Sequence, residues 1–138
     1  MIEGSLSVDD LPDAWNQRYA NDLGIRPPSD ASGVLQDVHW SAGLIGYFPT
    51  YTLGTLAAAQ LFEEAGRQLG DLDGVIGRGE FGVLLDWLRS TIHRHGSRYE
   101  ATELIERSCS SDLKADAFLA HVRQLASEVY GVGSSELL

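Results

Sequence analysis

Apolar residues recur at helical spacing along most of the chain. The first stripe predicts a helix over about 12–23, ended by Gly24, and consists of Trp15, Tyr19 and Leu23. No stretch alternates apolar and polar residues for long enough to predict a strand. The pattern therefore indicates an all-α fold.

Four more helices are predicted after residue 47. The run TLAAAQLFEEAGRQL has high helix propensity and lies in a helix over about 48–69, whose expected buried face is Leu53, Leu56, Ala57, Leu61 and Ala65. Helices over about 80–95, 100–108 and 112–130 follow, the last with Ser111 as its cap. The apolar stripe of the last helix is Phe118, Val122, Leu125 and Val129. The Gly- and Asp-rich run 69–79 is a connection with room for a short helical turn.

The stretch 24–47 has no clear period. Glycine, proline and serine residues interrupt it, and a segment of this length without periodicity is usually either a functional loop or a disordered one. Its aromatic and branched residues favour order. The predicted organisation is a single helical portion with an N-terminal helix at 1–24, a loop at 25–47, helices at 48–130 and a frayed tail at 131–138.

Composition and charge narrow the class of protein. A length of 138 residues suggests one domain, with hydrophobic and charged fractions of 43% and 22% that are ordinary for a globular chain. A net charge of -10 disfavours nucleic-acid binding, which needs clustered basic side chains. The single cysteine, Cys109, cannot form an internal disulfide, which fits a reducing cytoplasm. We expect no signal peptide and no membrane span, because neither pattern occurs.

Familiar catalytic motifs are absent from the sequence. The four histidines do not form an HExxH pair, so a metal site made wholly within this chain is not expected. There is no GxSxG nucleophile turn either. Cys109 has no convincing histidine or basic residue near it, and a buried structural thiol is the expected role.

The richest group of polar and aromatic side chains is the block 33–51. It supplies an amide, a carboxylate, an imidazole and two phenols, from Gln36, Asp37, His39, Tyr47 and Tyr51. Such groups can bind a peptide backbone or a carboxylate and can stabilise an oxyanion. A second interpretation stays open, in which the aromatic residues, Trp40 among them, are core residues and the amide and carboxylate tie down the loop.

GVLQDVHW at 33–40, followed by GYFPTYTLGTLAAAQLF at 46–62, resembles the C-terminal region of the M32 metallocarboxypeptidases, the Taq carboxypeptidase family. The match to the family's GxxQDxHW motif is complete at Gly33, Gln36, Asp37, His39 and Trp40. Flanking sequence also fits, from about Ile2 to Tyr130. The resemblance implies a mostly helical fold with a cleft, similar to angiotensin-converting enzyme and neurolysin. This chain would be a bundle-like C-terminal fragment of that fold, with Met1 falling inside a helix of the family.

The resemblance also implies roles for individual residues. His39 would hydrogen-bond the peptide near the scissile carbonyl, and Tyr51 would donate its phenol to the oxyanion, so both are the expected catalytic residues that stabilise the transition state. Gln36, Asp37 and Tyr47 would join them in binding substrate, with Asp37 orienting His39 or the loop. The family binds a divalent ion, usually zinc, through an HExxH helix and a downstream Glu. Both lie before the matched region, so the metal cofactor belongs to the full-length parent and not to this chain.

Two functions follow from these observations. In the first, the chain is the substrate-binding portion of a metallocarboxypeptidase, a hydrolase that is inactive without its N-terminal metal-binding portion. Its partners would be that portion, a peptide substrate and a second copy of the protein, in the cytoplasm and with no nucleic acid or membrane. In the second, the chain is a stand-alone helical interaction or dimerisation module that carries out no catalysis.

Overall fold

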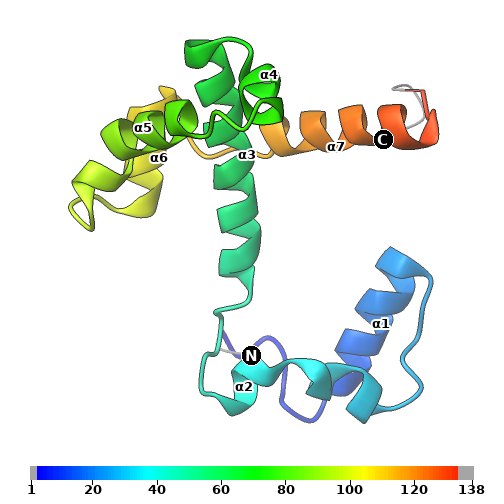
Figure 1. Cartoon of the computed structure of the whole chain (residues 1–138). Helices are drawn as coiled ribbons and strands as arrows, with labels where there is room; N and C mark the ends of the chain where they lie inside the picture. The colour runs from blue at the N-terminus through cyan, green and yellow to red at the C-terminus, as the bar shows by residue number, and fades with distance from the viewer. Residues whose placement is uncertain (1–2, 134–138) are drawn as a thin grey trace. The chain divides into compact units, whose positions relative to one another are not determined.

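The structure, a computed structural model, describes residues 3–133 and divides into two compact units, Met1–Phe48 and Pro49–Leu138 (Figure 1). Within the described range every regular element is a helix, which confirms the all-α prediction. No helix there combines the length and the apolar character that crossing a membrane requires. The end of the predicted tail, 134–138, lies outside the described residues.

The first unit contains one long helix and three short ones. α1 spans Leu11–Leu23, and the 3-10 helices η1, Asp30–Ser32, and η2, Val34–Gln36, precede the short helix α2, Val38–Ser41. Gly24 ends α1 as predicted, because it takes a left-handed backbone with φ 68° and donates its N–H to the carbonyl of Ala20 at 3.1 Å. The stretch 25–47, which was predicted as a loop, is therefore ordered, because the three short helices η1, η2 and α2 lie within it.

Gly33 marks a close approach of two backbone segments in this unit. A Cβ atom at this position would lie 3.1 Å from Cβ of Pro27 and 3.3 Å from the carbonyl oxygen of Ser29. Both neighbours are rigid, since one is a proline ring and the other is backbone. Packing against Pro27 and Ser29 thus explains the glycine that opens the GxxQDxHW motif. The helix η2 that follows it contacts α1.

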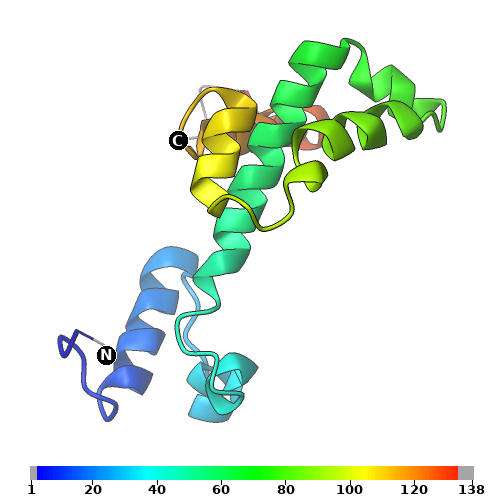
Figure 2. The same ribbon diagram turned by 90° about the vertical axis from the view of Figure 1, so that its left-hand side faces the viewer.

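The second unit is built around α3, Pro49–Leu69. Four helices contact it: α4, Leu72–Gly77; α5, Gly82–Thr91; α6, Ala101–Cys109; and α7, Asp116–Tyr130. The 3-10 helix η3, His93–His95, follows α5. Figures 1 and 2 show these helices gathered around the part of α3 that lies away from its first turns.

Two of the predicted helix bounds were wrong. The helix predicted over 80–95 ends at Thr91, because the N–H of His95 bonds to the carbonyl of Ile92 in the tighter 3-10 pattern. The helix predicted from 112 begins at Asp116, so Ala115 and not Ser111 takes the cap position. The reason is tertiary, since Gln60 of α3 holds the loop before α7 by hydrogen bonds to Ser111, Asp112 and Lys114.

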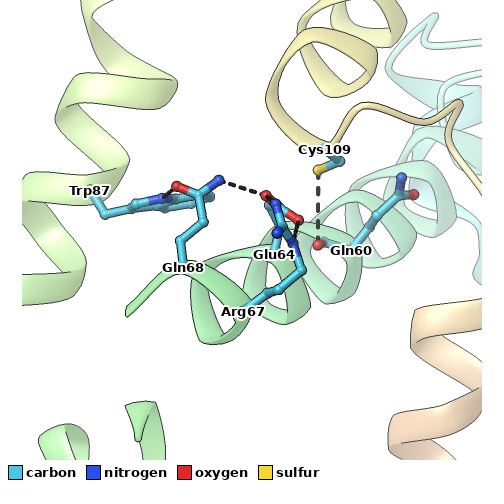
Figure 3. A network of polar contacts seen from close by, with 6 residues as sticks. All are labelled: Gln60, Glu64, Arg67, Gln68, Trp87 and Cys109. Atoms are coloured by element: carbon cyan, nitrogen blue, oxygen red, sulfur yellow. Dashed lines mark hydrogen bonds and ion pairs between the residues drawn. The ribbon is translucent and has the colours of Figure 1, made fainter. Parts of the chain in front are cut away.

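The core of the second unit lies between α3, α4 and α5. Its buried residues are Ala65, Leu72 and Trp87, and the apolar side chains packed on them are Leu61, Leu69, Ile76, Leu84 and Leu88. The indole N–H of Trp87 donates to Oε1 of Gln68 at 2.8 Å, and Gln68 in turn donates to Glu64 (Figure 3). The polar edge of the Trp87 indole is therefore satisfied.

Other parts of the predicted apolar stripes are exposed. On α3, Ala65 is fully buried, whereas Leu53, at the other end of the same predicted face, is 52% exposed. On α7 the stripe residues Val122, Leu125 and Val129 are all exposed. The helical period was correct, but in the part of the chain that the structure describes these faces are not covered.

Candidate functional site

The turn that follows Gln36 is organised by the carboxylate of Asp37. Asp37 is the N-cap of α2, and its Oδ1 accepts the backbone N–H of His39 at 2.9 Å. The same oxygen lies 2.7 Å from Nδ1 of the His39 ring. Its other oxygen, Oδ2, accepts the indole N–H of Trp40 at 2.6 Å. One carboxylate thus fixes the backbone, the imidazole and the indole of its own helical turn.

The side chains of Asp37 and His39 are largely removed from solvent. The side chain of Asp37 is 9% exposed and that of His39 is 17% exposed. Burial raises the pKa of the Asp37 carboxyl group, but the hydrogen bonds from His39 and Trp40, together with the charge on His39, lower the pKa more, so that it lies below its ordinary value of 3.8. Asp37 is therefore a carboxylate at neutral pH.

Aromatic rings surround the imidazole of His39. The ring of Tyr47 stacks on it with centroids 5.5 Å apart and planes 27° apart. The ring of Phe48 meets it edge-on at 5.5 Å and 77°. The structure therefore brings Asp37, His39 and Tyr47 together within one unit, as a group that can present an imidazole and a phenol.

Gln36 and Tyr51 are placed differently from that group. Gln36 is exposed and donates its amide N–H to the carbonyl of Ala31, across the two 3-10 helices. Tyr51 lies in the first turn of α3, in the second unit, with 54% of the residue exposed, and its carbonyl accepts the hydroxyl of Thr55 at 2.9 Å. The amide oxygen of Gln36 can still accept a hydrogen bond from a ligand, because only its amide nitrogen is engaged with Ala31.

Trp40 and Phe48 also contribute to the geometry, although the sequence analysis assigned neither of them a role in binding or catalysis. Trp40 is the second donor to Asp37, and Phe48 borders the His39 ring. The signal for Trp40 was present in the sequence, since it is a fixed position of the GxxQDxHW motif and carries a polar N–H that a half-buried indole must satisfy. No comparable sequence signal distinguished Phe48 from a core aromatic.

Cys109 lies far from this group in sequence and contacts different residues. Its thiol donates to the backbone carbonyl of Gln60 at 3.9 Å, and it has no disulfide (Figure 3). Burial, followed by the nearby charges of Glu64 and Glu63, raises the pKa of the thiol. A half-buried thiol with a raised pKa is a poor nucleophile, which agrees with a structural role.

The described residues do not form a metal site. Across 3–133 no group of three or more His, Cys, Asp or Glu side chains is placed to hold an ion. The carboxylate of Asp37, next to the His39 ring, is already engaged by three N–H groups, the backbone and ring of His39 and the indole of Trp40. The arrangement is suited to hydrogen bonding and positioning.

Comparison with known proteins identifies the family. The family model for the carboxypeptidase Taq (M32) metallopeptidases matches residues 1–125, so the chain belongs to that family. This confirms what the GxxQDxHW motif and its flanks predicted. The chain is therefore related to metal-dependent peptide hydrolases of the carboxypeptidase class.

Individual relatives agree in sequence and in fold. Thermostable carboxypeptidase 1 of Thermus thermophilus is 47% identical over 131 residues, and carboxypeptidase 1 of Bacillus subtilis is 38% identical over 130. The M32 carboxypeptidase from Deinococcus radiodurans superposes with a TM-score of 0.89 at 42% identity, and metallocarboxypeptidase 1 of Trypanosoma cruzi with 0.84 at 35%. These matches cover 89% to 95% of this chain but only 26% or 27% of the relatives. The chain spans about a quarter of their length.

Proposed function

We propose that the chain forms the C-terminal, substrate-binding portion of a metal-dependent carboxypeptidase that releases C-terminal residues from peptides. Family membership supports the class of reaction. The observation that carries the proposal for this portion is the hydrogen bond of 2.7 Å between Asp37 and the His39 ring, because it orients an imidazole that a loop of purely structural role does not need. The half-exposed phenol of Tyr47 beside that ring adds a second polar group.

The proposed roles divide between transition-state stabilisation and binding. Tyr51 donates its phenol to the oxyanion that forms at the scissile carbonyl, and His39 hydrogen-bonds the peptide backbone beside it. Tyr47 and Gln36 hold the terminal carboxylate or the nearby backbone, and Asp37 orients His39. All of these residues act by hydrogen bonding, which matches the donors and acceptors present.

The proposed metal belongs to the longer enzyme. Zinc or another divalent ion would be held by residues outside the described stretch, since those within it make no metal site. The isolated chain is then a part of an enzyme without hydrolytic activity of its own. Its partners are the N-terminal metal-binding portion, a peptide and, in the assembled enzyme, a second copy. The single free cysteine supports a cytoplasmic location.

The test compares the chain alone with the assembled enzyme. The purified chain should release no C-terminal residues from peptides, with or without added Zn²⁺. Mixing it with the HExxH-bearing N-terminal portion of a family member should restore release. In that mixture Tyr51→Phe and His39→Ala should each lower kcat/KM, Tyr51→Phe by about 10²–10³-fold, the cost of one oxyanion donor.

Tyr130→Phe is the matched control, because it also removes one phenol, from an exposed tyrosine at the end of α7. It should leave kcat/KM unchanged. Zinc-dependent release by the chain alone would overturn its proposed inactivity. Full activity in both Tyr51→Phe and His39→Ala would remove these residues from the site.

The second candidate function is a helical interaction or dimerisation module. A groove between α3, α4 and α7, with a volume of about 930 Å³, supports it. Its lining includes the apolar side chains Phe62, Phe118 and Leu125 and the carboxylates Glu63, Asp73 and Glu128. If this function holds, the chain should associate through the groove while Tyr51→Phe and His39→Ala change nothing measurable.

A further inference from the structure

The groove between α3, α4 and α7 lies wholly within the second unit. Its volume of about 930 Å³ gives room for several large side chains, since binding pockets typically hold roughly 300–1,000 Å³. Four alanines are part of its lining, Ala58 and Ala59 on α3 and Ala117 and Ala120 on α7. Such short side chains let the backbone of a partner approach closely.

Large apolar side chains in this groove are open to solvent. Phe62 on α3 is 46% exposed, Leu125 on α7 is 48% exposed, and Phe118 on α7 is half-buried. Removing apolar surface from water is the main favourable contribution to protein association. A groove lined by apolar side chains is also the surface that binds the apolar face of an amphipathic helix, whose anchors recur every three or four residues.

Carboxylates lie in the same lining without basic partners. Glu63, Asp73 and Glu128 all line the groove, and within the described residues no Lys or Arg forms an ion pair with any of them. Glu128 accepts a hydrogen bond from an amide of its own helix. Among the described residues of the lining none is Lys or Arg, and His121 is the one imidazole. Charge complementarity therefore favours an occupant that carries Lys or Arg.

A second copy of this chain matches these charges poorly. The chain has a net charge of -10, and two grooves that faced each other would bring carboxylates of both copies together, which disfavours the contact. Exposed apolar side chains can still associate isolated chains at high concentration. Added salt should then strengthen the contact between two copies, because it screens their repulsion, and weaken the contact with a basic partner.

We propose that the groove between α3, α4 and α7 is a docking site for an amphipathic helix whose apolar face is bordered by Lys or Arg, and that the N-terminal portion of the longer enzyme supplies this helix. The apolar side chains of the groove cover its apolar face, and the three carboxylates pair with its basic side chains. The supplier of the helix rests on the proposed function. This chain covers only 26% or 27% of its matched relatives, which leaves ample sequence for such a helix.

Two synthetic peptides test the preference in the 138-residue chain. Both are amphipathic helices of about 18 residues, five turns long, with the same apolar face of Leu and Ala. One carries Lys at the positions that border this face and the other carries Glu, which reverses the charge and keeps a high helix propensity. The amide ¹H–¹⁵N NMR signals of 55–63 and 117–128 should shift with the Lys peptide only. Raising NaCl from about 0.05 M to about 0.5 M should weaken its binding.

Charge variants separate the groove from the net charge of the chain. Glu63→Gln combined with Asp73→Asn should weaken binding of the Lys peptide about fivefold at low salt, the size expected for two partly exposed ion pairs. Glu100→Gln combined with Glu106→Gln is the matched control, because it removes two charges from exposed positions at α6, which does not line the groove. It should leave the affinity nearly unchanged, and an equal loss in both variants would overturn the proposal.

The peptides also decide between the possible occupants. Equal binding of the Lys and Glu peptides, or shifts confined to residues outside the groove, would overturn the proposal. A groove that binds neither peptide, in a chain whose self-association increases with salt, would assign the surface to a second copy and would also overturn it.

A competition experiment tests the source of the helix. The HExxH-bearing N-terminal portion should displace a fluorescent Lys peptide from the chain, as measured by a fall in fluorescence anisotropy. Restored release of C-terminal residues with the Lys peptide still bound in the groove would overturn the docking proposal and leave the proposed function standing. Displacement of the peptide without restored release would support the docking site and count against the proposed function.

Discussion

Asp37 shows how one short side chain can organise a helical turn. It caps α2, receives the ring of His39 and receives the indole of Trp40, all within three residues. Because these contacts are local, they were accessible to sequence reasoning: an aspartate side chain commonly accepts the backbone N–H two residues further on. The direction in which the His39 ring faces required the structure.

The lowered pKa of Asp37 predicts how the turn responds to acid. The folded chain binds this proton less readily than the unfolded chain, so Asp37 contributes stability that is fully present above the unfolded-state pKa, near 3.8. That stability is lost as the pH falls through the lower, folded-state pKa. The amide signal of His39, followed by NMR against pH, should keep its position down to about pH 4 and shift below it.

Asp37→Asn is the control for this titration, since an amide does not ionise in this range. Its His39 amide signal should show no step in the same window. A step in the wild-type chain with its midpoint above 3.8 would contradict the prediction, because it would mean that the fold raises the pKa.

Gly33 offers a test of packing at single-residue scale. Gly33→Ala inserts a methyl group 3.1 Å from the Pro27 ring, and overpacking of this kind typically costs about 1–3 kcal/mol. Hydrogen exchange of the amides in 34–41, measured over a series of urea concentrations, should show the lower free energy of unfolding of the first unit. Gly54→Ala is the matched control: its methyl group meets nothing within 4 Å in α3, and it should stabilise the helix by about 0.5–1 kcal/mol.

At the scale of elements, α3 determines where its neighbours begin and end. Gln60 is 6% exposed, and its amide donates to Ser111 Oγ at 2.8 Å and to the carbonyl of Asp112 at 2.9 Å, while its Oε1 accepts the N–H of Lys114 at 3.1 Å. These bonds hold the connection between α6 and α7 in a non-helical path. Local propensity predicted four more residues of helix there, and the tertiary contact explains why they are absent.

Replacing Gln60 should release that connection. Gln60→Leu keeps the volume but leaves the N–H of Lys114 and the carbonyl of Asp112 without their buried partner, at a cost of about 1–3 kcal/mol. The free energy of unfolding in urea should fall by that amount, and the amide of Lys114 should lose its protection from hydrogen exchange. Gln124→Leu is the control, because exposed Gln124 bonds only within α7, to Glu128; unchanged stability in Gln60→Leu would contradict the role.

At the scale of the whole molecule, the chain combines a small core with large exposed apolar side chains. The buried apolar residues of the second unit are Ala65, Leu72, Trp87 and Ile105, whereas Phe62 and Leu125 in the groove between α3, α4 and α7 are exposed. Contiguous apolar surface of this kind marks an interaction site. The family relatives are about four times as long as this chain. Their additional residues could cover the apolar surface that is exposed here.

The isolated chain should therefore associate through α7. Sedimentation velocity over a range of concentrations should show self-association, and replacing Val122 and Leu125 together by Gln should reduce it, because both lie exposed on the apolar stripe. Arg123→Gln, a neighbouring substitution outside the groove lining, should have no effect. A chain that stays monomeric at every concentration would contradict the prediction.

The sequence predicted some features of the structure more completely than others. The helical period located α1, α3, α5, α6 and α7, because the apolar spacing of a helix is written in the residues themselves. The motif identified the family, and the resemblance predicted five site residues, Gln36, Asp37, His39, Tyr47 and Tyr51. Of these, the structure brings Asp37, His39 and Tyr47 into contact. Trp40 as the second donor to Asp37 and Gln60 as the clamp on the α6–α7 connection were missed, because a side-chain hydrogen bond depends on where the backbone has gone.

What the sequence determined by itself was the helical class, the family and the set of polar groups available around His39. These follow from local periodicity and from a motif, neither of which depends on long-range contacts. Only the tertiary structure decided which apolar faces are buried, where α5 and α7 are cut short, and which oxygen of Asp37 each neighbour uses. The physical reason is that burial and hydrogen-bond geometry are properties of pairs of residues, such as Gln60 and Lys114, that are distant along the chain and near in space.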